Sequence, residues 1–366
     1  MYDVAAYVWP AYTGKENRTR IFWPDGEGEW QTVRNATAKY DGHNWPRRPL
    51  LGYLDEADPN TAEKYIDLAS SHGVNVFIYD WYWYDRRPFL EQCLNDGFLQ
   101  AKNNNKMKFY LMWANHNLTH LLDIRNSQDC ETCIWQADVD RNEFEKIVRR
   151  LIDQYFRHPC YYKIDGKPVF SIYDFGNLKK GLGSMENVRD ALSWFRDECT
   201  RCGLAGLHLQ LILQSACTLN LSGVDHNRCT LTPEDIEYLQ ADSITHYQYV
   251  HFTNIDRDYL EILPDVVQEW KNLSSAYTVP YFPHVSVGWD NNPRFRHFMP
   301  GVLQNNTPEN VRLAFQEAKQ YIDAATLPAP LLTVNSWNEW TESSYLLPDD
   351  LYQYGYLEAI KQTFLS

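Results

Sequence analysis

The sequence has little positive charge for its length. Its 366 residues include 34 Lys and Arg against 48 Asp and Glu, which gives a formal net charge of −14. Nucleic acids and anionic membrane surfaces are bound by basic patches. The charge balance therefore argues against both as partners.

Long apolar runs are also absent from the sequence. A membrane-spanning helix needs roughly 18 or more consecutive apolar residues, and no stretch comes near this. The first residues, MYDVAAYVWPAY, show neither the charged n-region nor the small-residue cleavage site of a signal peptide. We therefore expect no membrane span, and a chain that is cytoplasmic, or periplasmic or secreted if the sequence is a mature form.

The spacings typical of metal and phosphate sites are missing too. Neither H-x-H nor H-E-x-x-H occurs near His116, His246 or His284, and no glycine-rich phosphate loop is present. The eight cysteines include two C-x-x-C pairs, Cys130/Cys133 and Cys199/Cys202. The first pair follows a strand and the second ends a helix, which are opposite ends of an α/β barrel. We expect ordinary thiols or a local disulfide rather than a shared zinc ion, and no metal or cofactor.

Aromatic residues, in contrast, are abundant. They make up 15% of the chain, with 13 Trp and 25 Tyr. Trp and Tyr combine a large apolar face with a polar atom at the rim, which suits the C–H faces and hydroxyl groups of sugars. This composition favours a carbohydrate ligand.

Short apolar runs alternate with helical patterns along the chain, and their near-continuous apolar character is typical of strands buried on both faces. The expected strands are 4–9, 74–83, 108–115, 168–174, 207–214, 243–249, 281–288 and 330–337. Helices are expected after Asp58-Pro59, from Asp140 with Glu143 as a capping box, after Thr307-Pro308, and around 87–104, 184–202, 257–273 and 351–364.

This alternation predicts an α/β fold, a single (β/α)8 TIM barrel over residues 1–366 with elaborated loops at the C-terminal face. The alternative is a doubly wound open sheet. That fold usually has fewer strands and a glycine-rich first turn, and YVWPAYTGKEN contains no such turn.

Function in a barrel is placed at the C-terminal ends of the strands. Aromatic and hydrogen-bonding residues gather at these predicted ends, which a sugar-binding cleft requires. The candidate substrate-binding residues are Tyr7, Trp9, Tyr53, Asp55, Asp80, Trp81, Tyr82, Trp83, Trp113, Asn115, His116, Asn117, Tyr173, His246, Tyr247, His284, Trp289, Asp290, Trp337, Asn338 and Tyr345.

The last predicted strand runs into NSWNEWTES, residues 335–343, which holds Glu339 and Glu342. Residues three apart share a face on a helical turn, so both carboxylates can point into the barrel mouth. Their proximity, with desolvation by Trp337, Trp340 and Tyr345, would raise one pKa and leave the other glutamate ionised. Cleavage of a glycosidic bond needs this division between acid and base. The alternative is a solvated acidic turn.

Five segments together resemble the WbsX-like proteins, which are related to family 99 glycoside hydrolases. They are GYLDEADP (52–59), VFIYDWYWYDRRPFLEQCLN (76–95), LMWANHN (111–117), YYKIDGKPVFSIYD (161–174) and NSWNEWTESSYLLPDDLYQYGYLEA (335–359). Family 99 contains retaining endo-α-mannosidases on a (β/α)8 barrel, and some WbsX-like members were named glycosyltransferases from their place in polysaccharide gene clusters.

The resemblance implies a role for each glutamate. In family 99 the catalytic pair lies in an Asn-Glu-aromatic-x-Glu stretch, which Glu339 and Glu342 match. By this match Glu339 is the base on the sugar 2-hydroxyl, which forms a 1,2-anhydro intermediate, and Glu342 is the general acid and base. The family has a glycine after the second glutamate, where this chain has Ser343-Ser344, and Gly52-Tyr53-Leu54-Asp55 only loosely echoes its substrate motif.

These observations predict a glycoside hydrolase that acts on a complex poly- or oligosaccharide. Two alternatives stay open. One is a glycosyltransferase of polysaccharide biosynthesis, which would need a nucleotide-sugar or lipid-linked donor. The other is a glycan-binding barrel without catalytic activity.

Overall fold

Eight parallel strands form a nearly closed barrel in the computed structural model, which describes residues 2–129, 132–214 and 231–365. Their order around the barrel is β10-β9-β8-β4-β2-β1-β12-β11, and a parallel bridge between Ile244 and Tyr281 lies between the two end strands. The strands are β1 (Asp3–Val8), β2 (Val76–Tyr84), β4 (Lys108–Trp113), β8 (Lys167–Ile172), β9 (His208–Ile212), β10 (Ser243–Thr245), β11 (His284–Ser286) and β12 (Leu331–Asn335). The predicted (β/α)8 barrel and all eight predicted strands are confirmed.

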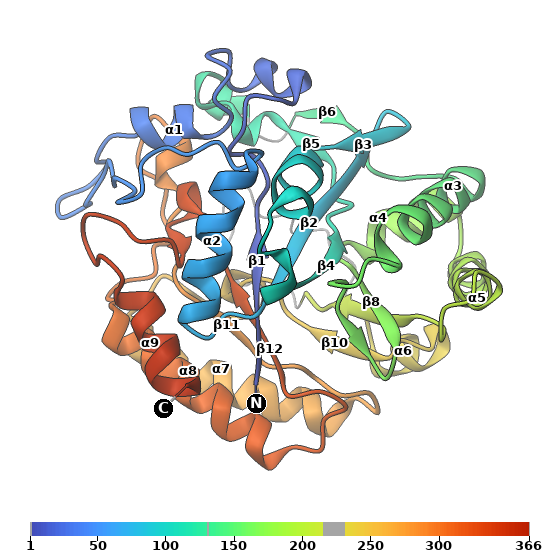
Figure 1. The fold of residues 1–366 in the computed structure, drawn as a ribbon. Helices are drawn as coiled ribbons and strands as arrows, with labels where there is room; N and C mark the ends of the chain where they lie inside the picture. The colour runs from blue at the N-terminus through green and yellow to red at the C-terminus, as the bar shows by residue number, and fades with distance from the viewer. Residues whose placement is uncertain (1, 130–131, 215–230, 366) are drawn as a thin grey trace.

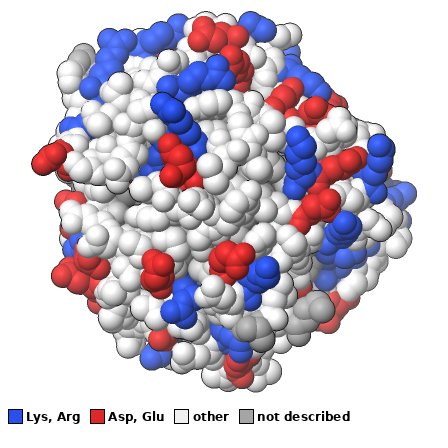
Figure 2. Space-filling view, turned by 60° about the vertical axis from the view of Figure 1, so that its left-hand side comes forward, with Lys and Arg blue, Asp and Glu red and all other residues white. Residues whose placement is uncertain are grey.

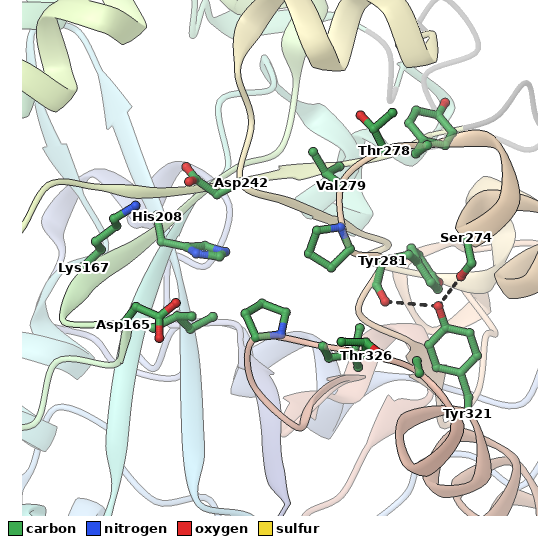
Figure 3. A pocket seen from close by; sticks show the side chains of 16 residues that line it. Asp165, Lys167, His208, Asp242, Ser274, Thr278, Val279, Tyr281, Tyr321 and Thr326 are labelled. Carbon is green, nitrogen blue, oxygen red and sulfur yellow. Dashed lines mark hydrogen bonds between the residues drawn. The ribbon is translucent and has the colours of Figure 1, made fainter.

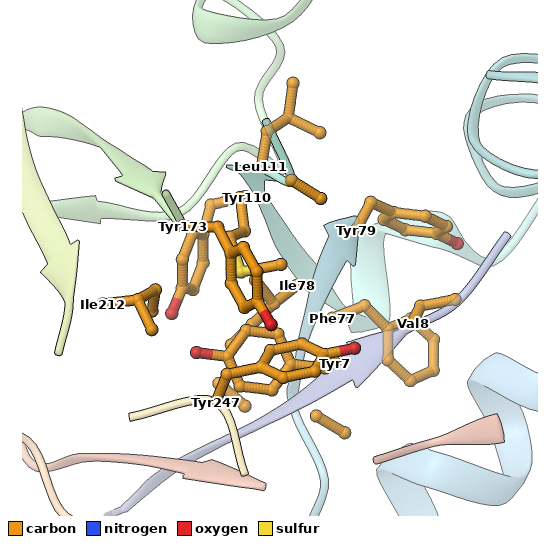
Figure 4. Packing of buried hydrophobic residues seen from close by; sticks show 14 of the residues in the cluster. Tyr7, Val8, Phe77, Ile78, Tyr79, Tyr110, Leu111, Tyr173, Ile212 and Tyr247 are labelled. Atoms are coloured by element: carbon orange, nitrogen blue, oxygen red, sulfur yellow. The ribbon is translucent and has the colours of Figure 1, made fainter. Parts of the chain in front are cut away.

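The strands are buried on both faces, as their apolar sequences predict. All nine residues of β2 are buried, and β1 and β12 are buried from Val4 and Leu331 onward. Figure 4 shows the phenol groups of Tyr7, Tyr173 and Tyr247 gathered on one side of β1 and β2, with Tyr79 on the other. The barrel interior is therefore lined with tyrosines, and the outer face carries the residues that pack against helices.

Helices follow the strands, and most of them begin at side-chain caps. Asp58 caps α2 through the backbone N–H of Asn60, and Asp140 caps α3 through that of Glu143. The helices are α1 (Trp30–Asn35), α2 (Pro59–Ser71), α3 (Arg141–Leu151), α4 (Phe175–Leu182), α5 (Met185–Arg201), α6 (Pro233–Leu239), α7 (Tyr259–Ala276), α8 (Pro308–Ala324) and α9 (Gly355–Phe364). The expected helices at 184–202, 257–273, 307 onward and 351–364 correspond to α5, α7, α8 and α9.

The helix expected at 87–104 is wrong. Asp85 and Arg86 both have positive φ, 53° and 58°, and form a tight turn that leads β2 into an antiparallel partner, β3 (Arg87–Phe89). Positive φ at both central residues is what a two-residue hairpin of right-handed twist requires. A π-helical turn (Cys93–Gly97) and 3-10 turns (Phe98–Gln100 and Asn104–Lys106) follow, so the segment contains no regular α-helix.

Additional chain lies at the end of the barrel toward which β1 runs. In Figure 1 the N-terminal segment with α1, and the small strands β5 (Leu118–Thr119) and β6 (Cys133–Trp135), lie at the top of the view, above the barrel strands. These segments follow the C-terminal ends of β1 and β4. The loops at the C-terminal face are therefore elaborated, as predicted.

Charged side chains of both signs lie side by side over much of the face shown in Figure 2, with an uncharged area across its middle. None of the helices within residues 2–129, 132–214 and 231–365 has the length and apolar composition needed to cross a membrane. Of the two C-x-x-C pairs, Cys133, Cys199 and Cys202 are free thiols, and Cys130 lies outside the described residues.

Candidate active site

The segment after β12 folds into a tight double turn. It comprises β13 (Asn338–Glu339), a 3-10 turn (Trp340–Glu342) and β14 (Ser344–Tyr345), which pairs with β13. The Ser336 hydroxyl accepts a hydrogen bond from the backbone N–H of Glu339 at 2.7 Å and donates one to the carbonyl of Ser344 at 2.6 Å. This serine holds the two arms together, so Glu339 and Glu342 lie on one compact turn.

A single guanidinium contacts both glutamates. Arg294 Nη1 donates to Glu342 Oε1 at 2.6 Å, and Nη2 donates to Glu339 Oε2 at 3.3 Å. Its Nε donates to the hydroxyl of Thr341, between them in sequence, at 2.8 Å. Arg294 ends a 3-10 turn that follows β11 and is 4% exposed. The same cation therefore reaches both carboxylates.

A third carboxylate completes the surroundings of this arginine. Glu29, just before α1, is fully buried and lies 3.5 Å from Arg294 Nε. Its oxygens accept hydrogen bonds from Trp9 Nε1 at 2.6 Å, from the Thr341 hydroxyl at 2.9 Å and from the Tyr12 hydroxyl at 3.1 Å. Three donors and a nearby cation compensate the burial of this carboxyl group. Glu29 therefore balances part of the Arg294 charge.

Glu339 is linked on its other side to Asp80. The Tyr247 hydroxyl lies 3.0 Å from Asp80 Oδ2 and 3.0 Å from Glu339 Oε1. Asp80 comes from β2 and Tyr247 follows β10, so the chain of groups crosses the barrel mouth. Asp80 and Tyr247, both predicted from the sequence, are thus brought together with Glu339.

Burial changes the protonation of this cluster. It raises the pKa of Glu339 well above the ordinary range, the negative charge of Glu342 raises it further, and Arg294 opposes both. Burial likewise raises the pKa of Asp80 well above its usual value, against the hydrogen bond from Tyr247, and Glu342 adds to the rise. The raised pKa of Glu339 is the perturbation expected of a catalytic carboxyl group.

An aromatic wall extends from Tyr247. Its ring centroid lies 4.7 Å from that of Tyr7 and 5.2 Å from that of Tyr173, which Figure 4 shows converging. His116 continues the wall, 5.5 Å from Tyr173 and 5.8 Å from Tyr82. These five predicted residues form one surface beside Glu339 and Asp80.

Trp9 and Asn338 position the double turn instead of lining a cleft. The Asn338 amide accepts from the backbone N–H of Trp9 and donates to its carbonyl, both at 2.8 Å. The same amide donates to both oxygens of Glu56, at 2.9 and 3.1 Å. Asp55, the predicted neighbour, is exposed and caps the turn at Ala57. Glu56, which we did not predict, is therefore the carboxyl group that reaches the motif.

Several predicted aromatic residues lie outside this cluster. Trp81 donates to Glu91 at 2.7 Å and Trp83 to Glu143 of α3 at 3.1 Å, so both indoles face the helices. Alternate residues of a strand face opposite sides, which separates these indoles from Asp80 and Tyr82. Trp113 packs against Trp81, with centroids 6.4 Å apart. These three residues belong to the packing between the barrel and its helices.

The aromatic residues of and around the motif are divided in the same way. Trp337 packs against Tyr65 of α2 and Phe77, at 5.8 and 5.1 Å, and so lies on the outer face of the barrel. Trp340 stacks on Tyr345 at 3.9 Å. Tyr53 packs edge-on against Trp30 at 5.3 Å. Of the three aromatic residues expected to desolvate the glutamates, Trp337 is therefore separated from them by the strand.

The remaining polar candidates are held by structural hydrogen bonds. Asn115 exchanges two hydrogen bonds with the backbone of Asp174, at 2.7 and 2.8 Å, and Asn117 accepts from the backbone N–H of Ala137 at 3.0 Å. Asp290 lies 3.0 Å from His43 and accepts from Tyr40 at 2.7 Å, and Trp289 beside it is buried. These residues order the loops around the site.

The two remaining predicted histidines, His246 and His284, are buried and contact hydroxyl groups. His246 Nδ1 lies 2.9 Å from the Tyr281 hydroxyl, and burial lowers its pKa to about 3. Both ring nitrogens of His284 lie 3.0 Å from a hydroxyl group, of Thr333 and of Ser286, and burial lowers its pKa too. Within the described ranges no group of three or more His, Cys, Asp or Glu side chains is placed to hold a metal ion.

Ser343 stands where the resemblance to family 99 would place a glycine. Its φ of 53° lies in the left-handed region, where glycine is favoured. A glycine at this position therefore has a conformational reason, and this chain replaces it with a serine whose hydroxyl accepts from Trp45 Nε1 at 3.3 Å.

A cavity of about 530 Å³ lies at the opposite end of the barrel. Figure 3 shows Lys167, His208 and Asp242, at the N-terminal ends of β8, β9 and β10, on one side of it and Tyr281 and Tyr321 on the other. The N-terminal face of a barrel generally serves stability, and chemistry is placed at the C-terminal face. The glutamate pair, not this cavity, is therefore the candidate active site.

A family model described as glycosyltransferase WbsX matches residues 4–360. The uncharacterized protein WxcX of Xanthomonas campestris pv. campestris is 26% identical over 347 residues, 93% of this chain and 46% of its own length, so the chain spans about half the length of the curated relatives it matches.

Solved structures share the fold. A GH99 endo-alpha-mannosidase from Bacteroides thetaiotaomicron is 15% identical with a TM-score of 0.62, over 99% of this chain and 96% of its own. A family 1 β-glucosidase from Thermotoga maritima is 11% identical with a TM-score of 0.50, over 100% and 98% of the two chains. At these identities the likeness concerns the barrel architecture.

Proposed function

The chain belongs to the family described as glycosyltransferase WbsX, and we propose that it is a glycan-processing barrel enzyme, a glycoside hydrolase that cleaves a glycosidic bond in a poly- or oligosaccharide. The observation that carries the proposal is the pair Glu339 and Glu342 on one buried turn, both hydrogen-bonded to Arg294. Two carboxyl groups at the rim of a barrel are the minimum that acid/base cleavage of a glycoside requires.

The proposed roles follow the resemblance to family 99. Glu339 takes the proton of the sugar 2-hydroxyl, whose oxygen attacks the anomeric carbon and displaces the leaving group. Glu342 gives its proton to the leaving oxygen and then takes one from the water that opens the 1,2-anhydro ring, while Glu339 returns its proton to the sugar 2-oxygen. Because Glu342 Oε1 accepts from Arg294, a protonated Glu342 would carry its proton on Oε2. The result is retention of configuration.

The aromatic wall supports a carbohydrate substrate. Tyr7, Tyr82, His116, Tyr173 and Tyr247 lie next to Asp80 and Glu339, which combines ring faces with hydrogen-bonding atoms. Sugars present C–H faces and hydroxyl groups that match both kinds of surface. The GH99 endo-alpha-mannosidase of the same fold makes α-mannosides reasonable first substrates.

A glycosyltransferase is the second candidate, because the family description names that activity. The same two glutamates could transfer a glycosyl group to an acceptor hydroxyl in place of water. This reaction needs an activated donor, which separates it from hydrolysis experimentally.

The test is a screen against a broad panel of bacterial, plant and host polysaccharides and α-mannosides, with the products identified by mass spectrometry. New reducing ends with retained configuration would support hydrolysis. Calorimetric binding of a nucleotide sugar, with no cleavage of any glycan, would favour the transferase. Oligosaccharide binding with neither activity would identify a glycan-binding barrel and contradict the proposal.

A further inference from the structure

Tyr247 has one hydroxyl proton and two carboxyl neighbours at equal distance. Its oxygen lies 3.0 Å from Asp80 Oδ2 and 3.0 Å from Glu339 Oε1. A phenol donates one hydrogen bond, so it can satisfy only one of two ionised carboxylates. The second contact becomes a hydrogen bond only if the other carboxyl group is protonated and donates to the phenol oxygen.

We propose that Asp80 and Glu339 share one proton through Tyr247, and that Asp80 stores this proton at rest while Glu339 is ionised. Asp80 then donates to Tyr247, and Tyr247 donates to Glu339. Asp80 is a positioning residue in this scheme, because it acts on the substrate only through Tyr247 and Glu339.

The surroundings of Asp80 favour the neutral form of its carboxyl group. Asp80 is 3% exposed, and its Oδ1 is buried without a hydrogen-bond partner in the described part of the chain. A bare oxygen on a buried, ionised carboxylate costs several kcal/mol, whereas the carbonyl oxygen of a neutral carboxyl group costs much less. Burial accordingly raises the pKa of Asp80.

Glu339 differs from Asp80 in having a cation beside it: burial and Glu342 raise its pKa too, but Arg294 opposes them. Its Oε2 accepts from Arg294 Nη2 at 3.3 Å, so a permanent cation stabilises the ionised form. The proton that the two carboxyl groups share is therefore placed on Asp80, the carboxyl group farther from the guanidinium. The charged or titratable groups that lie around Asp80, Tyr247 and Glu339 include Arg294, Glu29, Glu342, Tyr7, Tyr12 and Tyr82.

The shared proton can move without a change in total charge. Transfer to Glu339 breaks the O–H bonds of Asp80 and Tyr247 and forms new O–H bonds on Tyr247 and Glu339. The tautomer with protonated Asp80 leaves Glu339 able to accept a proton, and the reverse tautomer does not. This use of the shared proton rests on the proposed function. Asp80 keeps Glu339 ionised, and so able to act as the base, at a pH where burial alone would protonate Glu339.

The first test needs no substrate. Wild-type protein is labelled with ¹³C at the aspartate and glutamate carboxyl carbons, and the NMR signals are followed from pH 4 to pH 9. We expect one buried aspartate to be protonated at pH 7, with its signal lost in Asp80→Asn and shifted in Tyr247→Phe, which keeps the ring. The Glu339 signal, assigned with Glu339→Gln, should be ionised at the same pH. Asp290 is a matched control, because it is 5% exposed but has a lowered pKa owing to His43.

Two outcomes overturn the inference. If Asp80 and Glu339 are both ionised at pH 7, no proton is shared. If Glu339 is protonated and Asp80 is ionised, the proton is stored at the wrong end. Both outcomes are read from the wild-type spectrum, once the two signals are assigned, so they do not depend on glycan cleavage.

The second test uses turnover once a substrate is known. The side-chain amide that Asp80→Asn introduces can still donate to Tyr247, so we expect this variant to retain turnover within tenfold of wild type. Asp80→Leu has no donor and should lose more than tenfold, with a change in its pH profile. Equal loss in both variants would mean that Asp80 must be ionised, which overturns the inference. If no glycan is cleaved but the NMR result holds, the proposed function fails and the shared proton stands.

Discussion

Arg294 Nη1 lies 2.6 Å from Glu342 Oε1, and the same guanidinium extends its second nitrogen to Glu339. The arginine thus fixes the two carboxyl groups relative to each other from a different loop. Its pKa is raised by the neighbouring negative charges of Glu342, Glu29 and Glu339, although its own burial opposes the charge.

Removing the Arg294 cation should destabilise the protein strongly. Arg294→Met leaves three buried carboxyl groups without their cation, and breaking a buried ion pair in this way costs about 3–5 kcal/mol. Arg294→Lys keeps the charge but not the forked geometry, so a smaller loss is expected. Urea unfolding at pH 7 measures both.

The matched control for Arg294 lies two residues away. Arg296 is exposed and donates to the carbonyl of Ile124, so Arg296→Met should change the free energy of unfolding by less than about 0.5 kcal/mol. Equal effects at both positions would contradict the central place of Arg294.

The stability of the protein should fall as the pH rises from 5 to 7, in part because of Asp80. Its folded-state pKa is raised, so the folded protein holds a proton that the unfolded chain, with an aspartate pKa near ~3.9, has lost. Stability then decreases with pH by about 1.4 kcal/mol per pH unit for each such group. Asp80→Asn should reduce this slope by about that amount, as measured by urea unfolding at pH 5, 6 and 7.

Asp290 is the control for this slope. Its pKa is lowered, so its contribution to stability is complete above the unfolded pKa and is lost only as the pH falls through the folded value. Asp290→Asn should lower stability equally at pH 5 and pH 7. Identical slopes for wild type and Asp80→Asn would show that Asp80 titrates normally.

Gly288 should tolerate no side chain. A Cβ there would lie 2.4 Å from the carbonyl oxygen of Ser343 and 2.4 Å from the Asn306 side chain. Gly288→Ala should therefore displace the turn that carries Glu342, lower stability by about 1–3 kcal/mol and reduce turnover. Gly42→Ala is the comparison, because nothing lies within 4 Å of its Cβ and only its φ of 83° opposes the change. Unchanged turnover in Gly288→Ala would show that the turn adapts.

Ser343→Gly should be nearly neutral for stability. The φ of 53° costs a serine about 1 kcal/mol, which glycine avoids, but glycine loses the hydrogen bond from Trp45 and has a more flexible unfolded chain. We expect a change below about 1 kcal/mol and retained turnover, both measured beside wild type. A loss of turnover above tenfold would give the serine a role in the site.

The sequence predicts the barrel well because most strands are rich in apolar residues and most helices begin at a side-chain cap. It also predicts Glu339, Glu342, Asp80 and Tyr247, which stand at strand ends. It fails at 87–104, where Asp85 and Arg86 adopt positive φ and form a hairpin without the Asn-Gly or Asp-Gly pair that typically marks such a turn.

Arg294, Glu29 and Glu56 were missed because their partners lie far away in the sequence. Arg294 follows Trp289 and Asp290 by only a few residues, yet its contacts are with Glu339 and Glu342 on the turn after β12. The available signal was physical, since two buried carboxylates require a cation nearby. The strand-end rule also misplaced Trp81, Trp83 and Trp113, because it ignores which face of the strand a residue occupies.

The turnover of Glu339→Gln and Glu342→Gln on the first glycan that the wild type cleaves tests the central claim most directly. Each variant should lose at least about 10²-fold in turnover while keeping its thermal stability, because each removes a proton-transfer group. Glu237→Gln, at an exposed position of α6, is the control and should match wild type. Turnover near the wild-type value in both Glu339→Gln and Glu342→Gln would show that the pair is structural and would contradict the account.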